Sequence, residues 1–253
     1  MYIDTHCHLY KEYYDNIDDV IKESVDNGVT KFIVNGSCMN SNIESLELSH
    51  KYKEIYAAIG FHPTELDDFS DEYFSWLEER INDRKVVAIG EIGLDYHYDE
   101  TDKEKQIYVF RRQLDIAKKY NKPIIVHTRD AIQDTFDILK EYNLTGSIHS
   151  YSGSLEMARE FVKLGYMIGI GGIVTFKNAK NIKEVVKNID LEYILLETDS
   201  PYLTPEPYRG TLNSSKYIPI IARCIGEIKG ISEFDVMRIT TLNANRAFDF
   251  LND

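Results

Sequence analysis

The stretch from Tyr2 to His8 reads YIDTHCH, and it distinguishes between the two folds that a chain of alternating strands and helices can form. Its first residues suit a short buried strand, which ends in two histidines with no glycine beside them. An open doubly wound sheet requires a glycine-rich turn after its first strand, where a phosphate is bound. The missing turn favours the alternative, in which parallel strands close into a barrel.

A short apolar run followed by a longer amphipathic run repeats along the chain. The apolar runs are rich in isoleucine and valine, which is typical of parallel strands with both faces buried. They are Tyr2–Thr5, Lys31–Asn35, Ile55–Gly60, Val86–Gly90, Pro123–Val126, Gly146–Ile148, Tyr166–Ile170 and Tyr193–Leu196. The expected helices include Lys103–Tyr120, Ala131–Tyr142, Leu155–Leu164 and Asn181–Lys187, followed by Tyr217–Lys229 and Glu233–Phe250. Eight strands that alternate with helices predict an α/β fold, a TIM (β/α)8 barrel with additional C-terminal helices.

The length and composition agree with a single domain that spans residues 1–253. A complete barrel needs roughly 250 residues, and contents of 43% hydrophobic and 28% charged residues are ordinary for a globular protein. No apolar run approaches the roughly 18 residues of a membrane span, and the start of the chain does not read as a signal peptide. The three cysteines are widely spaced, which suits reduced thiols. We therefore expect a cytoplasmic protein with no membrane association.

Side chains that can bind a metal occur at the carboxyl ends of five expected strands. They are His6, His8, Glu91, His127, His149 and Asp199. In a barrel these strand ends form one rim, which carries the active site. Side chains alternate along a strand, so His6 and His8 point the same way and both can reach one ion. Such groups are costly to gather at one mouth without a cation, so we predict a metal centre there.

Two further carboxylates are expected to support the ligands. By alternation, Asp4 shares a face with His6, and Glu197 shares a face with Asp199, so both should point into the barrel below the metals. A metal-bound imidazole usually donates its second N–H to a carboxylate or a carbonyl, and Asp4 is a natural acceptor. An equally acceptable interpretation is a buried carboxylate with another partner. A structural metal site is normally closed and four-coordinate, so six ligands at an open mouth favour an enzyme over a non-catalytic scaffold.

Five short motifs resemble those of the TatD-related deoxyribonucleases, a family of the metal-dependent hydrolase superfamily. They read THCHL from Thr5, GFHP from Gly60, GEIGLDY from Gly90, HTRDA from His127 and ETDSPYL from Glu197. The motifs cover essentially the whole chain in order, and the third and fifth are highly specific. Two stretches depart from the family pattern. HSYSG from His149 differs mildly, whereas LNSS from Leu212 replaces a common RNEP and leaves the substrate preference open.

The resemblance implies a pair of divalent metal ions bridged by Glu91. One ion would be held by His6, His8, Glu91 and Asp199, and the other by Glu91, His127 and His149. The family hydrolyses phosphodiester bonds of DNA, often as an exonuclease from the 3′ end, so the resemblance also implies DNA as the substrate. Histidine-rich ligation admits Zn²⁺ or Mn²⁺, while phosphodiester hydrolysis often uses Mg²⁺, so the identity of the ions stays open.

Asp199 and Glu91 are the expected catalytic residues. Two ions roughly 3.5–4 Å apart can share a bridging water, lower its pKa and neutralise the charge of a phosphate. Asp199 can both bind an ion and take the proton of this water. The same centre could instead hydrolyse a small ester, lactone or amide, which is the alternative function.

The expected substrate-binding residues are His62, Arg129, Arg209, Tyr96 and Tyr202. The planar guanidinium groups and the imidazole suit a phosphate, and the tyrosines are placed where a base or sugar could stack. The net charge of −13 argues against a protein that tracks along duplex DNA through many phosphates. It does not oppose a pocket that admits one strand end, because bound cations reverse the local field.

Overall fold

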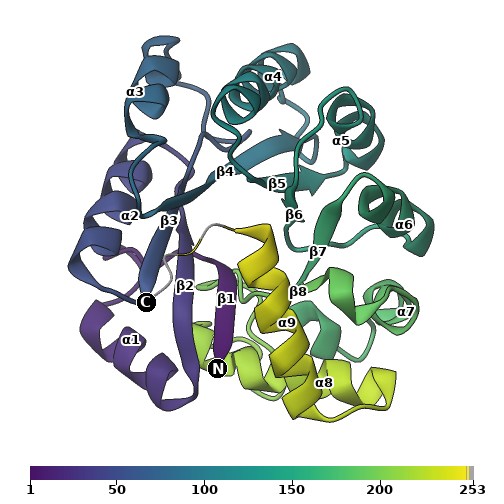
Figure 1. Ribbon diagram of the computed structural model, residues 1–253. Coiled ribbons are helices and arrows are strands. Elements are labelled where there is room, and N and C mark those ends of the chain that lie inside the picture. Colours follow the sequence, from purple (N-terminus) through teal and green to yellow (C-terminus); the bar gives the residue numbers. More distant parts are fainter. Residues whose placement is uncertain (249, 251–253) are drawn as a thin grey trace.

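The structure is a computed structural model that describes residues 1–248 and 250. Its parallel strands follow one another around a single sheet in chain order (Figure 1). They are β1 (Tyr2–Cys7), β2 (Val29–Asn35), β3 (Ile55–Ile59), β4 (Val86–Asp95), β5 (Ile124–Arg129), β6 (Gly146–Ile148), β7 (Tyr166–Ile170) and β8 (Ile194–Leu196). The sheet curls into a nearly closed barrel with helices between the strands, so the predicted (β/α)8 fold is confirmed.

Helices surround the sheet, and those before β8 connect its strands (Figure 1). They are α1 (Ile17–Asp26), α2 (Met39–Lys51), α3 (Glu72–Arg80), α4 (Lys103–Tyr120), α5 (Ile132–Leu139), α6 (Leu155–Lys163), α7 (Lys180–Asn188), α8 (Ile218–Lys229) and α9 (Glu233–Ala247). The last two are the predicted additional helices. The expected end of the final helix at Phe250 takes in residue 249, which lies outside the described residues, as do residues 251–253. No helix in the described part of the chain is both long and apolar enough to cross a membrane.

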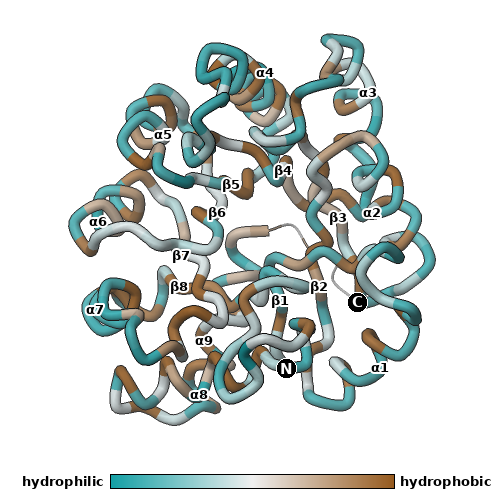
Figure 2. The backbone as a smooth tube through the Cα atoms, turned by 180° about the vertical axis from the view of Figure 1, so that it is seen from behind, coloured by the Kyte–Doolittle hydropathy of each residue, from teal (hydrophilic) through white to brown (hydrophobic). Residues whose placement is uncertain are grey.

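Helix α4 shows how local sequence places a helix against the sheet. It begins after Asp102, whose side chain accepts a hydrogen bond from the backbone N–H of Lys105, and it ends at Asn121 in the left-handed conformation. Phe110 and Leu114 lie one turn apart and are buried against the barrel. Figure 2 shows hydrophobic and hydrophilic residues alternating along the outer helices, as expected when one face of each helix packs on the sheet.

A hydrophobic cluster fills the barrel toward the amino ends of its strands. Helix α9 lies across this end (Figure 1) and adds its own apolar residues to the cluster. The cluster includes Ile3, Ile33, Tyr56, Val87, Ile125, Leu195, Ala244 and Phe248. Because α9 covers the amino ends, the loops that follow the strands surround the opposite end, where the metal ligands were predicted.

The barrel is completed between β8 and β1 by a short seam. Cys7 and Ser200 form a single parallel bridge. The backbone N–H of His8 donates to the carbonyl of Ser200 at 2.7 Å, and that of Asp199 donates to the carbonyl of His6 at 2.9 Å. The seam therefore places two histidines from the start of the chain beside an aspartate nearly two hundred residues later.

Candidate metal centre

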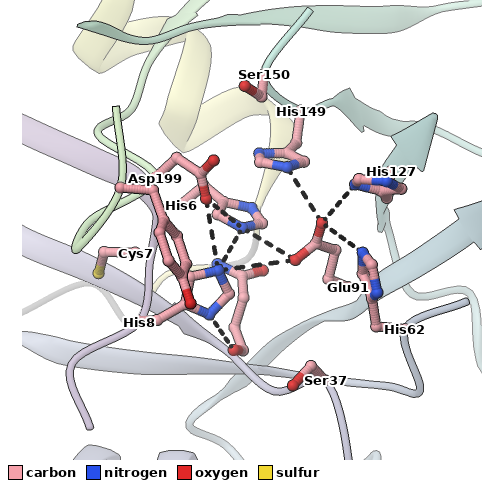
Figure 3. A network of polar contacts seen from close by, with 12 residues as sticks. His6, Cys7, His8, Ser37, His62, Glu91, His127, His149, Ser150 and Asp199 are labelled. Atoms are coloured by element: carbon pink, nitrogen blue, oxygen red, sulfur yellow. Dashed lines mark hydrogen bonds and ion pairs between the residues drawn. The ribbon is translucent and has the colours of Figure 1, made fainter. Parts of the chain in front are cut away.

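Glu91, on β4, lies at the centre of a cluster of imidazole rings (Figure 3). Its Oε1 atom lies 3.0 Å from Nδ1 of His127, 3.1 Å from Nε2 of His149 and 3.4 Å from Nε2 of His62. His127 is part of β5, whereas the other two histidines follow β6 and β3. Three strands thus direct imidazoles at one carboxylate oxygen.

The other oxygen of Glu91 faces His6, at the end of β1, and His8, which follows that strand. Its Oε2 atom lies 3.3 Å from Nε2 of His6 and 3.8 Å from Nε2 of His8. Oδ1 of Asp199 approaches the same two nitrogen atoms, at 3.8 Å from His6 and 3.5 Å from His8. Asp199 itself adopts a positive φ of 54°, which is uncommon for a residue other than glycine. Glu91 therefore lies between two groups of imidazoles, one on each carboxylate oxygen.

Three sets of ligand atoms in the described residues lie within 4.8 Å of one another. The sets are His6, His149 and Asp199; His6, His8 and Glu91; and His62, Glu91 and His127. Each of the six predicted ligands belongs to at least one set, and His62 joins them. Nitrogen and carboxylate oxygen donors at this spacing suit a divalent ion such as Zn²⁺ or Mn²⁺.

Hydrogen bonds behind the imidazoles orient them toward the centre. Nδ1 of His8 lies 3.0 Å from the carbonyl oxygen of Asn35, so this nitrogen carries the proton and Nε2 is left to face Glu91. Nε2 of His127 lies 3.0 Å from a carboxylate oxygen of Asp95, which leaves Nδ1 directed at Glu91. A partner of this kind is typical of a metal-binding histidine, because it fixes the tautomer and the ring orientation. The ring nitrogens without a proton, Nε2 of His8 and Nδ1 of His127, are therefore directed toward Glu91, where they can bind cations.

Glu197 lies beside His149. Its Oε1 atom is 3.4 Å from Nδ1 of the imidazole and also accepts a hydrogen bond from the backbone N–H of Ser150. The carboxylate occupies space that Gly169 on β7 leaves open, since a Cβ atom there would lie 2.2 Å from Glu197 Oε2. A larger residue at this position would displace the carboxylate that supports His149.

Asp4 does not accept from an imidazole, so the structure agrees with the second of the two interpretations, a buried carboxylate with another partner. Its carboxylate accepts from the hydroxyl of Thr198 at 2.6 Å, from the Thr198 backbone at 3.0 Å and from the backbone N–H of His6 at 3.2 Å. The physical reason is a shift of register in β1 between Asp4 and Cys7, which interrupts the strict alternation of side chains. Asp4 therefore ties β1 to the residue that precedes Asp199 and stabilises the seam.

Burial and mutual charges set the protonation of the cluster. Burial alone would raise the pKa of Glu91, but His149 and the neighbouring imidazoles hold it well below its usual range. Burial likewise opposes the shift at Asp199, whose pKa is lowered by His149 and by His8 and His6. Burial would lower the pKa of His149, whereas Glu91 and Asp199 raise it well above its usual value. Both carboxylates are thus ionised at neutral pH, and a divalent cation can replace the protons that the imidazoles hold.

A cavity of about 630 Å³ opens over this centre. Glu91, Asp199 and four of the histidines form its floor, and Tyr13, Tyr98, Tyr202 and Arg129 line its walls together with two carboxylates, Glu12 and Glu65. The ligand atoms are therefore accessible to a substrate. An accessible centre with more donors than a structural site needs is typical of a catalytic metal site.

Comparison with known proteins identifies the family. A family model described as TatD related DNase matches residues 3–249. The chain belongs to this family. YabD of Bacillus subtilis, described as an uncharacterized metal-dependent hydrolase, is 44% identical over 252 residues, which cover 98% of this chain and 99% of the relative.

Two solved structures of the TatD family are also similar. The crystal structure of YjjV, a TatD homologue from Escherichia coli, has a TM-score of 0.94 and 32% identity, covering 99% of this chain and 98% of that chain. A TatD family hydrolase from Entamoeba histolytica has a TM-score of 0.87 and 26% identity, with 98% of each chain covered. This chain is therefore a metal-dependent hydrolase of the TatD-related family.

Three of the predicted substrate-binding residues of this TatD-related hydrolase face its cavity. Arg129 and Tyr202 line the walls, as expected for residues that contact a substrate. His62 lies deeper than expected, because its Nε2 atom is 3.4 Å from Glu91 and its ring lies 4.3 Å from that of His127. It therefore borders the metal ligands themselves.

The other two predicted substrate-binding residues lie elsewhere. Tyr96 donates to Asp134 on α5 at 3.0 Å, and its ring lies under the ammonium group of Lys103. Alternation explains this, since Asp95 at the end of β4 points into the cavity and the next residue points away. Arg209 stacks on Phe176 in a separate groove, which sequence could not show because it lies in a long loop. Both residues correct the proposed set of cavity contacts.

The sequence interpretation missed Asp95 as a functional residue of the TatD-related centre. The signal was present, because Glu91 and Asp95 are four residues apart on one strand and therefore share a face. Tyr13 and Tyr98 were missed for a different reason. Each lies in a loop whose path the sequence does not reveal. Tyr13 lines the cavity, and its hydroxyl accepts a hydrogen bond from the hydroxyl of Tyr202 at 3.0 Å.

Proposed function

We propose that this protein is a deoxyribonuclease that hydrolyses a phosphodiester bond near the end of a DNA strand with two divalent ions. The observation that carries the proposal is the position of Glu91 between two sets of imidazoles, one on each of its oxygen atoms. A carboxylate between two ions can hold them at the separation, roughly 3.5–4 Å, that phosphodiester hydrolysis by two metals uses. The description of the matching family model, TatD related DNase, agrees with this substrate.

One ion would lie at each oxygen of the Glu91 carboxylate. One would be held by His6, His8, Asp199 and Oε2 of Glu91, and the other by His127, His149 and Oε1 of Glu91. Bound divalent ions would polarise the phosphate and make an attacking water more acidic. Imidazole nitrogen in both sets favours Zn²⁺ or Mn²⁺, and Mg²⁺ is the third candidate.

The side chains around the ions supply proton transfer and orientation. The low pKa of Asp199 keeps its carboxylate ionised, so it can accept the proton of the attacking water and return it to the oxygen that leaves phosphorus. Arg129 lies on the cavity wall, where its guanidinium can pair with a phosphate oxygen that points away from the ions. The exposed ring of Tyr202 offers a surface on which a base can stack.

The test is product analysis on end-labelled DNA. Single-stranded and duplex oligonucleotides are incubated with the protein and with Mg²⁺, Mn²⁺ or Zn²⁺ in turn, with Glu91→Ala as the control for contaminating nucleases. The proposal expects metal-dependent release of mononucleotides or short fragments from strand ends, absent in the control. No cleavage with any of the ions would refute it.

Glu12 and Glu65 favour a second candidate function, hydrolysis of an uncharged ester, lactone or amide, and the same test includes it. Both carboxylates line the cavity and repel phosphates, while an uncharged ester, lactone or amide would meet no repulsion there. Uncharged ester substrates are therefore assayed beside DNA. Hydrolysis of an ester without cleavage of DNA would replace the nuclease proposal with this second function.

A further inference from the structure

A second groove of about 500 Å³ is formed by the loops that follow β7 and β8. It is lined by Phe176 and Lys177, which follow β7, and by Glu206 and Arg209, which follow β8. The backbone N–H of Glu206 donates to the hydroxyl of Thr175 at 2.9 Å, which fixes the two loops to each other. The loop after β8 also carries Asp199 of the metal centre, so one segment borders both the cavity and the groove.

Arg209 is held in a way that leaves its hydrogen-bond donors available. Its guanidinium carbon lies 4.5 Å from the centre of the Phe176 ring, and the residue is exposed to solvent. Within residues 1–248 and 250, neither Arg209 nor Lys177 forms an ion pair. A guanidinium stacked on a ring keeps a fixed plane and presents its edge, which is the geometry that binds phosphate. Two available cations in a protein of net charge −13 therefore mark a place for an anion.

The other two grooves near the cavity have the opposite charge. One is lined by Asp67, Glu100 and Asp102 with the single cation Lys105. The other is lined by Glu65, Asp67 and Asp68, and none of its lining residues in the described chain is a lysine or an arginine. The first groove is formed by the loops after β3 and β4, and the second by the loops after β2 and β3. The negative charge of each groove repels a polyanion. Of these three grooves in the described chain, the groove at Arg209 is the one whose cations outnumber its carboxylates, since Glu206 is its single acidic residue.

Exposed aromatic side chains lie on the loop after β8, which contributes residues to both the cavity and this groove. Tyr202 lines the metal cavity and is 50% exposed. Tyr208 is 46% exposed and stacks on Tyr217, with ring centres 4.8 Å apart. Exposed rings beside cations are the combination that binds single-stranded nucleic acid, because the rings stack on bases and the cations pair with phosphates.

We propose that the groove at Lys177 and Arg209 binds the backbone of a single DNA strand whose end occupies the metal cavity. The strand would leave the metals past Tyr202 and reach the groove, because the loop after β8 borders both sites and the loops after β2, β3 and β4 form acidic grooves. The inference rests on the proposed nuclease function, and it adds a second contact region and the direction in which the substrate lies.

The experiment measures binding as a function of strand length. Fluorescein-labelled phosphorothioate oligothymidylates, a dinucleotide and a strand of about ten nucleotides, are titrated into the metal-loaded protein and followed by anisotropy. A single-stranded site of about 4–16 nucleotides is common, so the longer strand should reach the groove and the dinucleotide should not. Arg209→Ala and Lys177→Ala are compared with Arg112→Ala. The exposed Arg112 on α4 has its guanidinium carbon 4.6 Å from the centre of the Phe74 ring. Its substitution is therefore the matched control for losing an exposed arginine that stacks on a phenylalanine.

The proposal expects the wild-type protein and Arg112→Ala to bind the longer strand more tightly than the dinucleotide. Arg209→Ala should lose most of that gain, with a roughly tenfold rise in Kd for the longer strand. Its plot of log affinity against log salt concentration should also become shallower by about 0.7, the value for one phosphate contact on a single strand. Lys177→Ala should act in the same direction.

The outcomes separate this inference from the nuclease proposal. Equal binding of both lengths by a wild-type protein that cleaves DNA would overturn the groove and leave the nuclease intact. If Arg209→Ala and Lys177→Ala both keep the wild-type Kd and salt slope, the groove is likewise overturned and the nuclease proposal stands. Length-dependent binding that needs Arg209, in a protein that cleaves no DNA, would support the groove and overturn the nuclease. A wild-type protein that binds no DNA would overturn both.

Discussion

Replacing Asp95 by asparagine should weaken metal binding without disturbing the fold. The carboxylate lies 3.0 Å from Nε2 of His127 and holds the proton on that nitrogen, so that Nδ1 is available to an ion beside Glu91. The Asp95→Asn amide can turn its NH₂ group toward Nε2. The imidazole would then carry its proton on Nδ1, where the ion should bind.

The size of the effect follows from the bond that is lost. A hydrogen bond to a charged group contributes roughly 1.5–3 kcal/mol, and loss of the carboxylate behind a metal-binding histidine lowers affinity by about 10–100-fold. Competition between the protein and a chromophoric chelator for Zn²⁺ or Mn²⁺ measures this change directly. The melting temperature of the metal-free protein should stay close to that of the wild type, since the substitution keeps the size of the side chain.

Asp130→Asn provides the matched control. Asp130 also pairs with a histidine, His97, at 2.9 Å, but both side chains are largely exposed and neither belongs to the sets around Glu91. Its substitution should leave metal affinity unchanged. Wild-type metal affinity in Asp95→Asn, or an equal loss in both variants, would show that Asp95 does not orient His127.

Three further predictions concern the centre and the cavity. Glu91→Ala should abolish metal-supported hydrolysis and lower the bound metal, while the fold survives because the side chain contacts the site and not the hydrophobic core; near-normal turnover would remove the two-ion model. Asp199→Asn should lower kcat by roughly 10²–10⁴-fold, with a smaller rise in KM, because the residue acts as a base; an unchanged kcat in steady-state kinetics would place the base elsewhere. Arg129→Ala should lower kcat/KM for DNA by roughly ten- to a hundredfold and have little effect on an uncharged ester. Equal losses on both substrates would mean that Arg129 supports the fold or the metals.

The sequence predicted those features that follow from the order and period of residues. Short apolar runs located the strands, and the residues directly after them located Glu91 and His149 at one rim. These predictions succeed because a parallel barrel brings all carboxyl ends of its strands together, whatever the loops do. A ligand residue that directly follows a predicted strand can therefore be assigned to the rim of the barrel from the sequence alone.

Strand alternation was less reliable close to the seam of the barrel. It placed Asp4 below the metals with His6, whereas the register shift in β1 turns Asp4 to Thr198 on the other side of the seam. The same rule, applied to β4, would have selected Asp95 and rejected Tyr96. A local irregularity of one residue is invisible in the sequence and reverses the direction of a side chain.

Loop residues were the least predictable from sequence. Arg209 is ten positions beyond Asp199 and was expected at the mouth, but its stacking on Phe176 holds it in the neighbouring groove. Tyr98 was not expected there and lines the cavity. The positions of both depend on contacts between segments far apart in the chain, which no local period specifies.

The most direct test of the account is the position of metal ions relative to Glu91. Crystals grown or soaked with Mn²⁺ or Zn²⁺ give anomalous difference maps in which each bound ion appears as a separate peak. The account predicts two peaks roughly 3.5–4 Å apart, one beside each oxygen of the Glu91 carboxylate, with His6 and His8 at the first and His127 and His149 at the second. A single peak, or peaks that leave Glu91 without an ion, would contradict the account.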